Sequence, residues 1–111
     1  MEEEIAMLIR IMIVKKHSGC FIVQPHTLAG SGDTVRFSAI NIDVKTKVII
    51  NFPGGSPFVE EENLFILRGN ESRERTINKE APYGTYPFSA FCTEYNTFAE
   101  GGSSGELIVG P

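Results

Sequence analysis

The side chains in this sequence that are most capable of chemistry are two cysteines, Cys20 and Cys92, and two histidines, His17 and His26. Cys92 follows a stretch rich in aromatic residues that begins at Pro82, and a loop rich in polar residues and glycine comes after it. Two cysteines allow one disulfide or none, and thiolate and imidazole groups are ligands for zinc and copper. The choice between a disulfide, a metal site and an inert buried thiol depends on the elements that position these residues.

Catalytic patterns are missing from the sequence. Neither histidine is accompanied by an acid and a nucleophile in a pattern that predicts a catalytic triad. The glycines are typical of turns and lack the spacing of a phosphate-binding loop or a dinucleotide-binding fingerprint. We therefore expect that the protein is not an enzyme.

The bulk properties describe a single acidic domain. The chain has 111 residues, near the commonest domain size, and a formal net charge of −4. Its basic residues are scattered, with Lys15-Lys16 as the only adjacent pair, so the sequence lacks the clustered positive charge of a nucleic-acid-binding protein. We expect no nucleic-acid partner.

The N-terminal segment shows no pattern of membrane targeting. Residues 1–4 are acidic where a secretory signal is basic. The apolar run of residues 5–14 contains Arg10 and is too short to span a bilayer. The sequence therefore predicts no signal peptide in this chain and no transmembrane segment.

Short apolar or alternating segments, separated by turn residues, predict an all-β protein. Residues 34–40 alternate, with Val35, Phe37 and Ala39 on one face, which is the period of a half-buried strand. No segment has a sustained helical periodicity. We expect about eight short strands in a Greek-key β-sandwich that forms a single domain over residues 1–111. The expected strands cover residues 5–14, 20–24, 34–40, 47–52, 64–67, 73–77, 86–91 and 107–109.

Four short motifs follow one another along most of the chain, from about residue 21 to residue 109. They are Phe21-x-x-x-Pro25, Gly32-Asp33-Thr34-Val35-x-Phe37, Tyr83-Gly84-Thr85-Tyr86 leading to Cys92, and Gly105-Glu106-Leu107-Ile108-Val109. In this order and spacing the series resembles the cupredoxins, the family of small blue-copper proteins. The resemblance implies a cupredoxin-like sandwich. It also implies an extracytoplasmic location, periplasmic or secreted, because the family usually works there.

The ligand set of that family is largely missing from this chain. A type 1 copper site needs two histidines and a cysteine thiolate, usually with a distant methionine. Family members place the first histidine after the strand that follows the Gly-Asp turn, but residues 41–47 contain none. The second histidine and the methionine normally follow the cysteine, but residues 93–101 contain neither. Cys92 is the one ligand that remains. It lies six residues after Tyr86 instead of the usual four, so Ala90 is an alternative occupant of the ligand position.

Three interpretations of Cys92 stay open. It is a small buried hydrophobic residue, a disulfide partner of Cys20, or a reactive thiol or metal ligand. In a cupredoxin-like fold the loop between the first two strands lies at the same end as the ligand loops. The resemblance therefore implies that Cys20 and Cys92 approach each other, and a disulfide requires Cα atoms within about 7 Å. His17 would share that end, so His17, Cys20 and Cys92 are a candidate non-standard site for copper or zinc.

Tyr95 and Phe98 are the residues that we expect to contact a protein partner. They lie in the loop that normally carries copper ligands, and loops at the end of a rigid sandwich often carry recognition. The predicted function is that of a cupredoxin-like domain without a type 1 copper site or other cofactor, which serves as a non-catalytic binding or structural module. The alternative is a copper-binding protein for electron transfer or metal delivery that uses Cys92 with non-standard ligands.

Overall fold

The computed structural model describes residues 6–16, 19–43, 45–93, 97–99 and 105–111. Within these ranges the regular structure consists of ten strands. They are β1 (Leu8–Lys16), β2 (Gly19–Ile22), β3 (His26–Gly30), β4 (Thr34–Ile40), β5 (Lys47–Asn51), β6 (Leu64–Arg68), β7 (Ser72–Thr76), β8 (Gly84–Cys92), β9 (Thr97–Phe98) and β10 (Gly105–Gly110). In this described part of the chain, no helix is long and apolar enough to cross a membrane.

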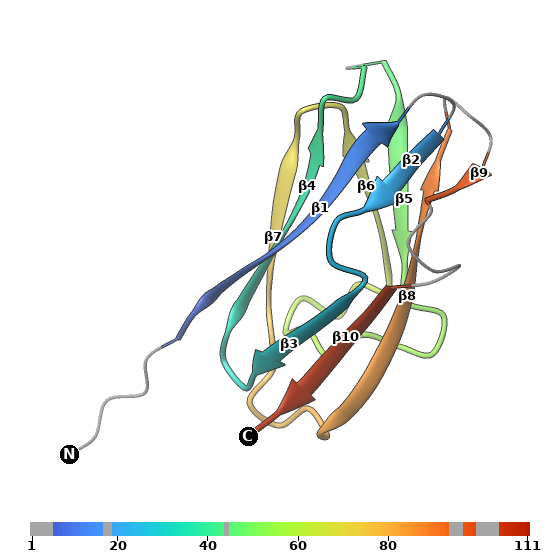
Figure 1. The fold of residues 1–111 in the computed structure, drawn as a ribbon. Helices are drawn as coiled ribbons and strands as arrows, with labels where there is room; N and C mark the ends of the chain where they lie inside the picture. The colour runs from blue at the N-terminus through green and yellow to red at the C-terminus, as the bar shows by residue number, and fades with distance from the viewer. Residues whose placement is uncertain (1–5, 17–18, 44, 94–96, 100–104) are drawn as a thin grey trace.

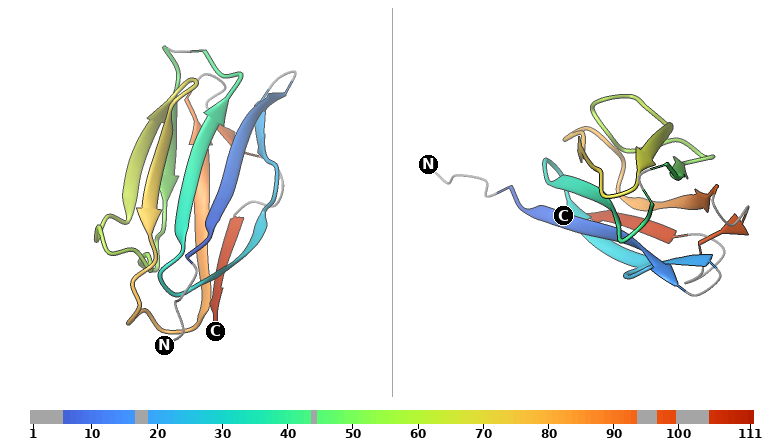
Figure 2. Two further views of the ribbon diagram at one scale, coloured as in Figure 1. Left: turned by 90° about the vertical axis from the view of Figure 1, so that its left-hand side faces the viewer. Right: turned by 90° about the horizontal axis from the view of Figure 1, so that it is seen from above.

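The strands form two sheets that pack face to face (Figure 1). One sheet has four strands in the order β2-β1-β4-β7. The other has six, in the order β3-β10-β8-β5-β6 with β9 paired to β8. Most neighbouring strands are antiparallel, but β1 pairs with β4 and β3 pairs with β10 in parallel. The chain crosses from the first sheet to the second between β2 and β3, where Pro25 interrupts the strand, and Figure 2 shows the two layers from the side and from above.

The predicted all-β sandwich is confirmed. Each of the eight expected segments overlaps an observed strand. The sequence does not predict β3 or β9, because neither has a distinctive local pattern. β3 forms through its parallel pairing with β10, and β9 through its pairing with β8, so both depend on contacts between distant parts of the chain.

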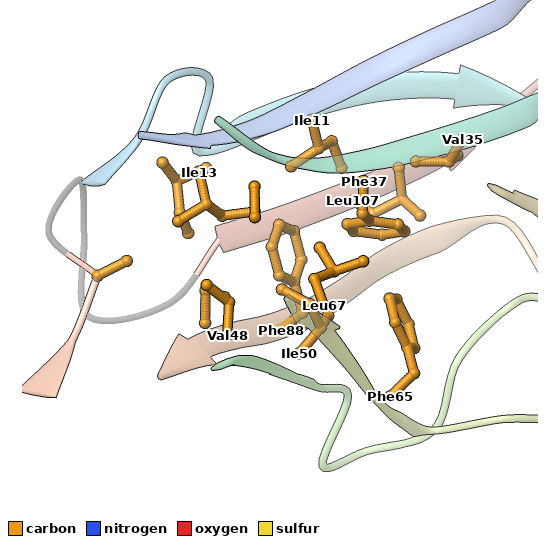
Figure 3. Close-up of a cluster of buried hydrophobic side chains, with 14 of the residues drawn as sticks. Ile11, Ile13, Val35, Phe37, Val48, Ile50, Phe65, Leu67, Phe88 and Leu107 are labelled. Carbon is orange, nitrogen blue, oxygen red and sulfur yellow. The ribbon is translucent and has the colours of Figure 1, made fainter. Parts of the chain in front are cut away.

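The core lies between the sheets, with Phe37 of β4 at its centre. Val35, Phe37 and Ala39 are buried, as the alternation of this segment predicts. The Phe37 ring makes edge-on contacts with four other rings at centroid distances of 5.1 to 6.2 Å. Those rings belong to Phe52, Phe58, Phe65 and Phe88. Figure 3 shows side chains from both sheets meeting here, among them Ile11 of β1 and Leu107 of β10. Each edge-on pair contributes roughly 0.5–1.5 kcal/mol beyond its buried area.

The Gly-Asp turn before β4 connects four elements. Gly32 has a φ of 82°, a conformation that favours glycine. The Asp33 carboxylate accepts hydrogen bonds from the backbone N–H groups of Met7 (2.9 Å) and Gly30 (2.8 Å). The Asp33 carbonyl accepts a further one from the N–H of Ile77 (2.8 Å). The turn therefore fixes the starts of β1 and β4 relative to the ends of β3 and β7.

Candidate functional site

β8 is the strand that delivers Cys92. Its first half pairs with β10 and its second half with β5. The Tyr86 hydroxyl donates a hydrogen bond to the carbonyl oxygen of Pro82 (2.6 Å), which fixes the entry to the strand. From Phe88 onward alternate side chains point into the core, so Phe88, Ala90 and Cys92 are all buried. Cys92 is thus the last residue of the strand, and its side chain faces the space between the two sheets.

A disulfide joins Cys92 to Cys20. The two Cα atoms are 6.7 Å apart, and each residue is 1% exposed. Cys20 lies in β2, opposite Lys15 of β1, whereas Cys92 lies in β8 of the other sheet. The bond therefore links the two layers of the sandwich covalently, between residues that are 72 positions apart in the sequence.

The disulfide changes what these cysteines can do chemically. A cysteine binds metals as a thiolate. In the disulfide, neither sulfur atom is a thiolate and neither is a free buried thiol. While this bond is intact, Cys92 and Cys20 do not supply the thiolates of the predicted site with His17, which stays a prediction. His17 itself lies outside the described residues. Among those that are described, no three histidine, cysteine, aspartate or glutamate side chains are grouped to hold a metal ion.

The connection from β4 to β5 lies at the end of the sandwich where β2 begins and β8 ends (Figure 1). The resemblance places a first histidine in this connection. Asn41 has a φ of 59° and Ile42 is buried. The Asp43 carbonyl accepts a hydrogen bond from the N–H of Thr46 (2.8 Å). This backbone packs directly on Gly69, where an added Cβ would lie 2.0 Å from the Ile42 carbonyl oxygen. The described part of this connection therefore buries Ile42 and packs its backbone against Gly69.

The backbone around Cys92 is held on β5. The Thr93 N–H donates to the Lys47 carbonyl (3.0 Å), and the Lys47 N–H donates to the Thr93 hydroxyl oxygen (3.0 Å). On the other side of the strand, the Ala99 N–H donates to the Ala90 carbonyl (2.7 Å), where β9 folds back on β8. Cys92 is therefore part of a paired strand and is not presented to solvent on a loop.

The remaining predicted site residues are Tyr95 and Phe98, and His26 is the second histidine of the sequence. Tyr95 lies outside the described residues. Phe98 lies in β9, with its Cα opposite that of Phe91. His26 lies in β3, and its Nδ1 is 2.7 Å from a carboxylate oxygen of Glu106 on the protein surface. No local pattern indicates that pair, because it follows from the parallel register of β3 and β10.

Exposed apolar side chains occur at positions that the sequence does not single out. Leu64 and Ile66 of β6 are 54% and 38% exposed, and Leu28 of β3 is 72% exposed. Residues 64–67 are continuously apolar, a pattern typical of strands buried on both faces. β6 is instead an edge strand whose alternate side chains point to solvent. The sequence gives the strand but not its place in the sheet.

Comparison with known proteins finds similarity in structure but not in sequence. No protein-family model matches the chain, and no curated protein sequence matches it significantly. Solved structures of amicyanin, a cupredoxin, are similar. Amicyanin from Paracoccus versutus (Thiobacillus versutus) is 17% identical, with a TM-score of 0.50 over 90% of this chain and 80% of that chain. A reduced Cu(I) form of an amicyanin mutant at pH 4 is 16% identical, with a TM-score of 0.53 over 98% of this chain and 86% of that chain. At these identities the similarity shows the fold alone, which is a cupredoxin-like β-sandwich.

Proposed function

We propose that the protein is a non-catalytic binding or structural module in which a cross-sheet disulfide uses the position of the copper-binding cysteine of cupredoxins. The observation that supports this proposal is the buried bond between Cys20 of β2 and Cys92 of β8. A sulfur used in this way stabilises the sandwich instead of binding a metal. The role that remains for the module is to present its surface to a partner protein.

The donor set of this chain does not fit a type 1 copper centre. Such a centre needs two imidazoles and a thiolate. Both histidines precede the Gly-Asp turn, and His26 already has Glu106 as a partner. Neither residues 41–47 nor residues 93–101 contain a histidine, and the Cys92 sulfur is bonded to Cys20. The residues present therefore do not support electron transfer through such a centre.

The working location that we propose is extracytoplasmic. Disulfides form and persist in oxidising compartments and are rare in the cytosol. The bond between Cys20 and Cys92 is buried and links the two layers, so we expect the sandwich to be more stable in a compartment that keeps the bond oxidised. This agrees with the location implied by the cupredoxin resemblance.

Copper addition to the native, non-reduced protein tests the proposal against copper binding through Cys92. Cu(II) is added while the thiolate-to-copper charge-transfer absorption is recorded, and bound copper is then measured by elemental analysis after desalting. The matched control is the Cys92→Ser variant. We expect no charge-transfer band and no stoichiometric copper in the native protein. A band that accompanies one copper per chain, and that Cys92→Ser removes, would overturn the proposal in favour of the copper-binding alternative.

A further inference from the structure

We propose that a second copy of this chain binds along the open edge of β6, so that the two six-stranded sheets continue into each other across a two-fold axis. This inference goes beyond the proposed function and does not depend on the disulfide. Three features of β6 support it: its unpaired backbone, its exposed apolar side chains and the arrangement of charge at its two ends.

The backbone of β6 is paired on one side. β6 is the last strand of its sheet and pairs with β5. The carbonyl of Asn63 accepts a hydrogen bond from the N–H of Phe52 (2.7 Å). Because hydrogen-bonding direction alternates along an antiparallel strand, the N–H and C=O groups of Leu64 and Ile66 point to the open side. Within the described ranges these groups have no backbone partner.

The same residues present apolar side chains to solvent. Leu64 is 54% exposed and Ile66 is 38% exposed, while Phe65 and Leu67 between them point into the core. A groove lined by β6 and by Arg73 of β7 runs beside this edge, and Figure 2 shows β6 and β7 along one side of the sandwich. An exposed apolar edge strand with free backbone groups is a template for pairing with another strand.

The neighbouring edge strand, β7, is protected against such pairing. The Thr76 carbonyl accepts a hydrogen bond from the Val59 N–H (2.8 Å), and the Thr76 N–H donates to the Glu60 carboxylate (3.0 Å). Arg75 is only 8% exposed, and its guanidinium donates to the Glu74 carbonyl (2.9 Å). Covered backbone groups and an inward-pointing charge both prevent edge pairing. The described residues of β6 have neither protection.

The charges around β6 are self-complementary. Residues 60–62 are three consecutive glutamates that precede the strand, and Arg68 ends it. Lys47 lies directly opposite Arg68 in the ladder, and both are exposed. Like charges at opposite positions are unfavourable, and neither residue has an ion pair with another described residue. An antiparallel second copy brings its acidic end to this basic pair.

One register satisfies all three features. Leu64 lies opposite Ile66 of the second copy, so their edge-facing backbone groups exchange hydrogen bonds and their apolar side chains meet. Two positions further along, Glu62 lies opposite Arg68 of the second copy. Glu62 bonds Arg75 through one carboxylate oxygen and is half-exposed, which leaves the other oxygen for Arg68. The two-fold axis makes every one of these contacts occur twice.

Sedimentation equilibrium of the full chain at concentrations up to about 1 mM tests the proposal. We expect the mass to rise from that of the monomer, 12.2 kDa, towards that of a dimer. Ile66→Lys should raise the dissociation constant roughly tenfold or more, because it places charges on the edge of both copies. Leu28→Lys is the matched control on the opposite edge of the same sheet and should leave the dissociation constant unchanged. Circular dichroism establishes that both variants fold.

A charge exchange tests the register. Arg68→Glu and Glu62→Arg should each weaken self-association, because each places like charges opposite each other, whereas an equimolar mixture of the two variants should associate again. A chain that is monomeric throughout the concentration range overturns the proposal and leaves the edge to a strand of a different protein. A dimer that Ile66→Lys leaves intact, or that Leu28→Lys dissociates, also overturns it, as does a mixture that fails to associate although both variants have wild-type melting temperatures.

Discussion

Breaking the bond between Cys20 and Cys92 should lower the free energy of unfolding by about 4 kcal/mol. The bond closes a loop between residues 72 positions apart. Constraining a loop of that length removes about 15 cal/mol/K of entropy from the unfolded chain, which corresponds to about 4 kcal/mol at 25 °C. Small domains have free energies of unfolding of about 5–15 kcal/mol. The loss is therefore a large part of the stability of this sandwich.

Urea unfolding of three forms of the protein measures this loss. They are the native protein, the protein after reduction, and the Cys20→Ala/Cys92→Ala double variant. Circular dichroism follows the transition, since the sequence contains no tryptophan. The reduced protein retains both sulfur atoms and so isolates the effect of the link, whereas the double variant adds the cost of the space that they leave, up to about 2 kcal/mol. Equal urea midpoints for the native and reduced proteins would refute the reasoning, because the link would then contribute nothing.

Three further substitutions test the packing and hydrogen bonds that position the site. Gly105→Ala should lower the free energy of unfolding by about 1–3 kcal/mol, because its Cβ would lie 2.4 Å from the Phe88 ring. Gly110→Ala in the same strand has no atom within 4 Å and is the control, so equal melting temperatures for the two variants would contradict this close approach. Asp33→Ala should lower the free energy of unfolding by roughly 1–3 kcal/mol, since two backbone N–H groups lose their acceptor. Unchanged rates of hydrogen exchange at those two amides would contradict this prediction. Tyr86→Phe should lower the free energy of unfolding measured by calorimetry by about 0.5–1.5 kcal/mol, because the Tyr86 hydroxyl donates to the carbonyl of Pro82. An unaltered unfolding transition would show that this hydrogen bond is not formed in solution.

The parts of the fold that depend on local pattern could be predicted from the sequence. Residues 34–39 alternate strictly, and the side chains of Val35, Phe37 and Ala39 are buried as that alternation requires. The Gly-Asp turn before them is equally local, because a φ of 82° at Gly32 is a property of the turn itself. What this motif does not indicate is that the Asp33 carboxylate reaches back to β1, which lies beside β4 through parallel pairing.

The candidate site depends on contacts that local pattern does not contain. The inward direction of Cys92 follows from the two-residue period of β8. Its bond to Cys20 requires β2 of the other sheet to lie across from it, and only the family resemblance implied that approach. The open edge of β6 is also a property of strand order. A run such as residues 64–67 looks the same in a central strand as in an edge strand, so the exposure of Leu64 and Ile66 could not be predicted.

The state of the two sulfurs in protein purified without reductant tests the central claim most directly. The protein is produced in an oxidising compartment, denatured, treated with a thiol-alkylating reagent without prior reduction, digested and analysed by mass spectrometry. We predict that the peptides containing Cys20 and Cys92 are linked to each other and carry no alkyl group. Two separate peptides, each alkylated at its cysteine, would contradict the claim that a disulfide between Cys20 and Cys92 links the two sheets of this sandwich.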